Sequence, residues 1–90
     1  MLYLIAYDIS DNRRLRRVAR TCEDFGIRIE KSVFECRLEE CDFEEMWERL
    51  SKIMHDGDRI VAYPIGAIEE SEIKVLGIKR TFRHIETYVF

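Results

Sequence analysis

An aspartate at position 8 is the residue best placed to do chemistry. Asp8 follows the apolar run of residues 1–7, which predicts a buried strand. A carboxylate at the end of such a strand is held rigidly beside hydrophobic neighbours, and it can then serve as a metal ligand or as a proton carrier. The alternative is that Asp8 caps the first turn of the helix behind it.

A group of arginines follows Asp8 directly. Residues 13–20 contain no acid and five arginines: Arg13, Arg14, Arg16, Arg17 and Arg20. Helical spacing places all of them except Arg14 on one stripe, opposite a core face of Leu15, Val18, Ala19 and Cys22. Neighbouring like charges repel, and no acid is interleaved to relieve that repulsion. The stripe therefore indicates a surface for a polyanion, with a solvated helix face as the alternative. An acid fixed beside such a stripe suggests a site that meets a phosphodiester.

Composition limits what the protein can be. With 90 residues, 47% apolar and 37% charged, the chain is expected to form one globular domain whose core is marginal, so dimerisation would help it. The net charge of −3 is segregated, because residues 39–48 carry six acids and no base, and a basic surface can still bind a polyanion. We see no signal peptide or membrane span, so we expect a cytoplasmic protein with no membrane partner. An odd number of cysteines, Cys22, Cys36 and Cys41, does not suggest disulfides.

Other chemistries find little support. His55, His84 and the cysteines have no zinc-site spacing. The four glycines form no phosphate-binding loop, and no Ser-His-Asp or Cys-His arrangement can be recognised.

The order of expected elements defines a fold class. We predict a strand at 2–8, a helix at about 12–25 stopped by Gly26, and strands at 27–31 and around 34–38. The apolar positions change parity between these two strands, so a turn or bulge should lie at 31–33, although one long bent strand fits nearly as well. A helix at about 42–55, opened by a capping-box pair of Asp42 and Glu45 and ended by Gly57, precedes a strand at 59–65. This βαββαβ order predicts an α+β, ferredoxin-like sandwich with both helices on one face of an antiparallel sheet.

Residues beyond this order are surplus. The core is expected at 1–66, and 67–90 form an extension of the same domain. Residues 73–76 and 87–90 look like strands, which could cover a sheet edge of the same subunit or of a partner.

One aspartate does not make a magnesium site, because Mg²⁺ takes six oxygens and usually one or two carboxylates. Two copies of Asp8 meeting about a two-fold axis could hold one ion and present it to a phosphate. Mg²⁺ is the expected cofactor, and Mn²⁺ is possible.

The chain resembles a known family in three segments. Residues 2–11 with Arg17-Val18-Ala19, residues 32–35, and residues 59–65 are similar to the motifs of the small CRISPR-associated adaptation proteins, the Cas-two family. The resemblance covers roughly residues 1–78. It implies a ferredoxin-like homodimer whose final strand lies across the partner. It also implies a metal-dependent endonuclease on RNA or DNA that acts in spacer acquisition beside the larger CRISPR integrase subunit.

The same resemblance points to functional positions. Asp8 would be the catalytic residue and the metal ligand, from both subunits, and the family pattern also falls on Tyr7, Arg17, Arg28 and Phe34. The expected nucleic-acid-binding residues are Arg13, Arg16, Arg17, Arg20 and Arg28, and the supporting residues are Tyr7, Ser10 and Phe34. Some family members have an arginine where this chain has Leu15, and that contact is then either lost or taken over by Arg13 or Arg16.

Two functions remain open at this point. One is a nuclease that works through paired Asp8 residues and a divalent ion. The other is a non-catalytic dimeric scaffold that bridges integrase dimers along a duplex, with arginines on phosphates. A ferredoxin-like small-molecule sensor is a third class, but no ligand motif supports it.

Overall fold

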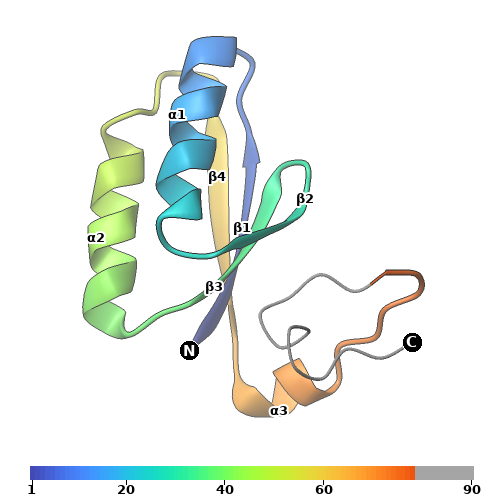
Figure 1. Ribbon diagram of the computed structural model, residues 1–90. Coiled ribbons are helices and arrows are strands. Elements are labelled where there is room, and N and C mark those ends of the chain that lie inside the picture. The colour runs from blue at the N-terminus through green and yellow to red at the C-terminus, as the bar shows by residue number, and fades with distance from the viewer. Residues whose placement is uncertain (79–90) are drawn as a thin grey trace.

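The computed structural model describes residues 1–78, which form a sheet with helices packed on one of its faces (Figure 1). In chain order, the elements are β1 (Leu2–Asp8), α1 (Asn12–Glu23), β2 (Ile27–Glu30), β3 (Val33–Arg37), α2 (Glu40–Ser51), β4 (Arg59–Ile65) and α3 (Ala67–Ser71). The strand order in the sheet is β2-β3-β1-β4, and all neighbours are antiparallel. This arrangement is the predicted ferredoxin-like sandwich.

The core lies between the sheet and the pair α1 and α2. Alternate residues of a strand point to opposite faces, so the odd-numbered residues of β1 face the helices. The fully buried residues of this layer come from both helices and from the two central strands: Ile5, Phe34, Cys36, Val18, Cys22 and Met46. The other face of the sheet carries Leu4, Ala6, Asp8, Val61 and Tyr63, because these positions pair across β1 and β4. Among the described residues, no helix packs over the centre of this face in Figure 1, and we call it the uncovered face.

Helix α1 begins at Asn12, as predicted, and ends at Glu23, two residues before the predicted end. Asp11 is its N-cap, and the backbone N–H of Arg14 donates to the Asp11 carboxylate at 2.9 Å. At the other end, Gly26 lies close against β3. A side chain at Gly26 would collide with the backbone carbonyl of Glu35 and lie 2.5 Å from the sulfur of Cys36. Glycine is therefore needed here for a close approach between backbones.

The predicted bounds of α2 are wrong by several residues. The helix begins at Glu40, not at 42, and its N-cap Glu39 makes no side-chain capping hydrogen bond. The capping box of Asp42 and Glu45 does not form, since both residues already lie inside the helix. The helix ends at Ser51 rather than 55, and Gly57, with φ of +90°, belongs to the loop before β4.

The change of face between β2 and β3 is confirmed as a tight connection. Lys31 and Ser32 form the turn, and the register of β2 against β3 shifts between Arg28 and Glu30. Two short strands, rather than one bent strand, thus carry the change of parity.

The segment after β4 differs from the prediction. Residues 67–71 form the short helix α3, which was not predicted, and residues 73–76 form no strand. The carboxylate of Glu70 in α3 forms a two-pronged ion pair with the guanidinium of Arg37, which ties α3 to β3. The other predicted strand, residues 87–90, lies outside the described residues. Across residues 1–78, the helices are too short or too polar to traverse a lipid bilayer.

Candidate functional site

Asp8 is the last residue of β1 and lies on the uncovered face. Asp8 is exposed, and it lies beside apolar residues of β1 and β4 such as Ala6 and Val61. The sequence pattern predicted the end of the strand but not the face of the sheet on which Asp8 lies. Asp8 alternates with the core-facing residues Ile5 and Tyr7, so its carboxylate points away from the core.

A shallow hollow of about 160 Å³ lies beside Asp8. It is lined by residues of β1 and β4: Ala6, Tyr7, Asp8, Arg59, Val61 and Tyr63. Arg59 is the residue directly paired with Asp8 across the two strands, so a cation stands next to the acid. Tyr63 adds a phenol whose residue is 52% exposed. We call this the Asp8 hollow.

Arg59 was not predicted as a site residue. Its position in the sequence is informative, because β1 and β4 are antiparallel, and the last residue of β1, Asp8, then pairs with the first residue of β4, Arg59. The pairing of these two strands had to be known before their end residues could be placed together.

Asp8 meets the simplest requirement for a shared metal ligand. Within residues 1–78 it forms no ion pair, and its exposed oxygens are directed to the uncovered face. No group of three or more His, Cys, Asp or Glu side chains gathers in this same range. Within the described residues, one chain thus supplies a single carboxylate to this hollow.

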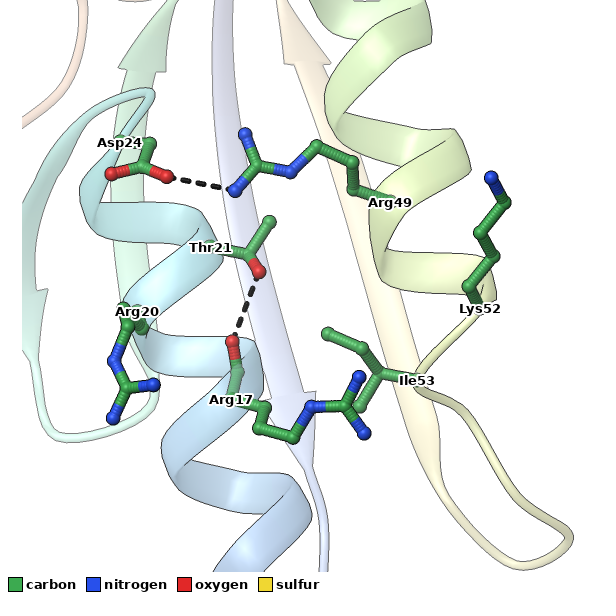
Figure 2. A pocket seen from close by; sticks show the side chains of 7 residues that line it. All are labelled: Arg17, Arg20, Thr21, Asp24, Arg49, Lys52 and Ile53. Carbon is green, nitrogen blue, oxygen red and sulfur yellow. Dashed lines mark hydrogen bonds and ion pairs between the residues drawn. The ribbon is translucent and has the colours of Figure 1, made fainter.

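The arginine stripe (Arg13, Arg16, Arg17 and Arg20) is confirmed as an exposed helix face, with Val18 and Cys22 buried opposite to it. The stripe contributes no residue to the Asp8 hollow. The helices and the uncovered face lie on different sides of the sheet, so one chain does not bring the acid and the stripe into one site. Arg17 and Arg20 instead line a groove against α2, which Figure 2 shows.

Arg14 has a different role from the stripe. Its guanidinium forms two hydrogen bonds with the carboxylate of Asp58, at 2.8 and 3.2 Å. The side chain of Asp58 is 1% exposed, and the Arg14 guanidinium lowers the pKa of that carboxyl below its usual value. This pair joins the start of α1 to the loop before β4. The expectation that Arg14 lies at the margin of the stripe is consistent with this position.

The supporting residues are largely internal. Phe34 is fully buried, and its ring lies 6.2 Å from that of Tyr7. Burial raises the pKa of Tyr7, and nearby Arg28 partly opposes that shift. The guanidinium of Arg28 lies 5.2 Å from the centre of the Phe34 ring and 3.9 Å from the carboxylate of Glu23. Phe34 therefore supports Arg28 and Tyr7 from inside the core. Arg28 and Ser10 themselves are exposed.

The comparison with protein families decides the relationship. The model of the family described as CRISPR associated protein Cas2 matches residues 1–73, which includes every element from β1 to α3. The chain belongs to the Cas2 family. The resemblance found in the three motifs is thus confirmed.

Individual Cas2 proteins agree with this assignment. The chain is 39% identical over 77 residues to "CRISPR-associated endoribonuclease Cas2 3" of Synechocystis sp., with 84% of each chain covered. It is 35% identical to "CRISPR-associated endonuclease Cas2 2" of Thermus thermophilus, which covers 86% of this chain and 82% of that one. Among solved structures, Streptococcus pyogenes Cas2 is similar with a TM-score of 0.75 and 34% identity, covering 86% of this chain and all of that chain.

Proposed function

We propose that this Cas2-family protein is a metal-dependent endonuclease that hydrolyses phosphodiester bonds of RNA or DNA in CRISPR adaptation. The observation that carries this proposal is the exposed Asp8 carboxylate in a hollow, with Arg59 directly opposite. The names of the relatives support the class of activity, because one is called an endoribonuclease and another an endonuclease.

The proposed catalytic unit is a homodimer. Asp8 lies on the uncovered face, so two chains that meet through this face would bring two Asp8 carboxylates together. Such a pair of oxygen donors suits Mg²⁺ or Mn²⁺, which would polarise the scissile phosphate and acidify a bound water. Asp8 holds the ion, and Arg59 offsets negative charge on the phosphate beside it. Tyr63 is exposed in the same hollow, and its hydroxyl would donate a hydrogen bond to the phosphate.

The arginine stripe would bind the polynucleotide. Its side chains are exposed and lie along one face of α1, where they can contact successive phosphates without reading sequence. Arg28 extends this basic surface from β2, at the edge of the sheet.

A second function is favoured by one observation. Because the stripe contributes nothing to the Asp8 hollow, duplex binding does not require Asp8. The alternative is therefore a non-catalytic dimeric scaffold that bridges dimers of the larger CRISPR integrase subunit along a duplex. In that case the arginines carry the function alone.

Replacement of Asp8 by asparagine distinguishes the nuclease from the non-catalytic scaffold. We expect Asp8→Asn to lower Mg²⁺-dependent cleavage of RNA or duplex DNA about a hundredfold or more, since a missing catalytic carboxylate has effects of that order. Dimerisation and duplex binding should be retained or improved, because a negative charge near phosphate is removed.

The matched control is Asp56→Asn, which removes an exposed carboxylate from the loop before β4 and should cleave like the wild type. Cleavage and binding are measured on the same labelled substrates, with and without divalent ions. Full activity of Asp8→Asn would reject Asp8 as the catalytic residue, and a wild type without metal-dependent cleavage would reject the nuclease and leave the scaffold.

A further inference from the structure

A groove of about 330 Å³ lies between α1 and α2 (Figure 2), whereas Asp8 lies on the uncovered face of the sheet. It is lined by Arg17, Arg20, Thr21 and Asp24 from α1 and its C-cap, and by Arg49, Lys52 and Ile53 from α2 and its end. We call it the interhelical groove. It contains four cationic side chains and one carboxylate, although the protein as a whole is negatively charged.

The single carboxylate only partly offsets these cations. Asp24 accepts a hydrogen bond from the Arg49 guanidinium at 2.7 Å. Both side chains of this pair are about half exposed, at 42% and 55%, so water screens the pair and it is weak. Within the described part of the chain, Arg17, Arg20 and Lys52 form no ion pair.

Two of the guanidiniums reach across the groove. In Figure 2 the Arg17 side chain extends from α1 toward Ile53, and the Arg49 side chain extends from α2 toward Asp24. Arg49 is also held by the ring of Phe25, whose centre lies 5.3 Å from the guanidinium carbon. Contact with an aromatic face restrains a cation and keeps it available to an anion. The two guanidiniums thus present donors from both walls, which is the arrangement that a phosphate recruits.

We propose that the interhelical groove holds a backbone phosphate of a polynucleotide, with Arg49 and Lys52 of the α2 side completing the basic surface begun by the arginine stripe. This inference rests on the proposed binding of polynucleotides by α1. The groove is open rather than enclosed, so a lone phosphate would remain largely hydrated and weakly held. A polymer adds the contacts of neighbouring phosphates on Arg13 and Arg16 of the same helix. Asp24 competes with the phosphate for Arg49 and weakens binding.

The test measures duplex affinity over a salt series. We expect the double variant Arg49→Gln with Lys52→Gln to bind more weakly at low salt. The slope of log affinity against log salt should flatten by about 0.9, which is the value for one lost duplex phosphate contact. Asp24→Asn should bind several-fold more tightly, because it frees Arg49 and removes a negative charge. Arg49→Lys should retain much of the salt slope.

The matched control has the same change in net charge. Lys31→Gln with Lys74→Gln removes two exposed lysines outside the groove, and it should leave the slope unchanged. Thermal unfolding of each variant shows whether the fold is retained. Lys52→Gln alone, at a residue without an ion pair, tests the groove if the Arg49 variants unfold.

The outcomes separate this inference from the proposed function. A salt slope equal to that of the wild type for the groove variants, together with a flatter slope for the double variant Arg13→Gln with Arg16→Gln, would overturn the role of the groove. The proposed binding of polynucleotides by the arginine stripe would then stand. A wild type that binds no polynucleotide would overturn both. Displacement of the duplex by millimolar inorganic phosphate at constant ionic strength would assign the groove to free phosphate, and would overturn its role in polynucleotide binding.

Discussion

The three cysteines show how burial decides the chemistry of a single residue. Cys22 and Cys36 lie in the core, whereas Cys41 is exposed on α2. Burial, with a smaller contribution from nearby Cys36, raises the pKa of the Cys22 thiol to about 12. Burial raises that of Cys36 to about 11. Since the thiolate is the reactive form, both core thiols should be inert.

We expect the native protein to be alkylated at Cys41 only. At mildly alkaline pH, a pKa raised by two units lowers the thiolate fraction roughly a hundredfold, and burial blocks access as well. Mass spectrometry after brief iodoacetamide treatment should find one modified cysteine among residues 22, 36 and 41, and all three after denaturation. Equal labelling of Cys22 and Cys41 in the folded protein would contradict this account.

At the same scale, the sequence predicted the position of Asp8 but not its surroundings. A strand end is visible in the apolar run before it, whereas exposure depends on which face the helices cover. Arg59, 51 positions further along the chain, becomes its neighbour only through the pairing of β1 with β4. The arginine stripe was predictable because helical spacing is a local property. Arg49 and Lys52 were not, since the packing of two helices brings them to Arg17.

At the scale of elements, the Arg14–Asp58 pair fixes α1 against the loop before β4. Asp58 also accepts the backbone N–H of His55 at 3.1 Å. The side-chain hydrogen bond from Arg14 is the main cause of the lowered pKa of Asp58. A lowered folded-state pKa gives stability that is present above the unfolded value of 3.8 and lost as pH falls through the folded value.

Asp58→Asn should therefore lower the melting temperature at neutral pH, and the gap to the wild type should narrow as pH falls below about 4. Thermal unfolding followed by circular dichroism at several pH values measures both effects. Asp56→Asn, at an exposed neighbouring position, is the control and should change the melting temperature little. A gap that stays constant from neutral to acid pH would show that the Asp58 carboxylate does not stabilise the fold through its charge.

Element boundaries were predicted least well where several signals compete. Acids at residues 39, 40, 42, 44 and 45 are all compatible with the first turn of a helix, so the spacing of Asp42 and Glu45 selected the wrong start. The apolar run at 73–76 predicted a strand, but a strand needs a partner edge, and this run finds none within residues 1–78. The strands that pair with one another within residues 1–78, by contrast, were all predicted.

At the scale of the whole molecule, the apolar surface is unevenly distributed. The uncovered face carries Tyr63 at 52% exposed, beside Leu4 and Val61. The segment after α3 adds Val75 at 43% and Leu76 fully exposed. Apolar side chains that gather on one face, as Leu4, Val61 and Tyr63 do, mark an interaction site in a soluble protein, and a small core gains most from covering them. The helical side is different, because its exposed positions are mainly charged.

We therefore expect a stable homodimer that associates through the uncovered face and the segment after β4. Light scattering coupled to size exclusion at micromolar concentration should give twice the mass of the chain.

Variants test which surface forms the dimer. Tyr63→Glu places a charge on the uncovered face and should shift the protein toward monomer. Truncation after Gly66 removes the exposed apolar residues Val75 and Leu76 and should weaken the dimer. Trp47→Glu alters a partly exposed aromatic of α2, on the helical side, and should leave the dimer intact. If the wild type is a monomer, two Asp8 carboxylates cannot share one ion, and the metal site proposed for catalysis is lost with the dimer.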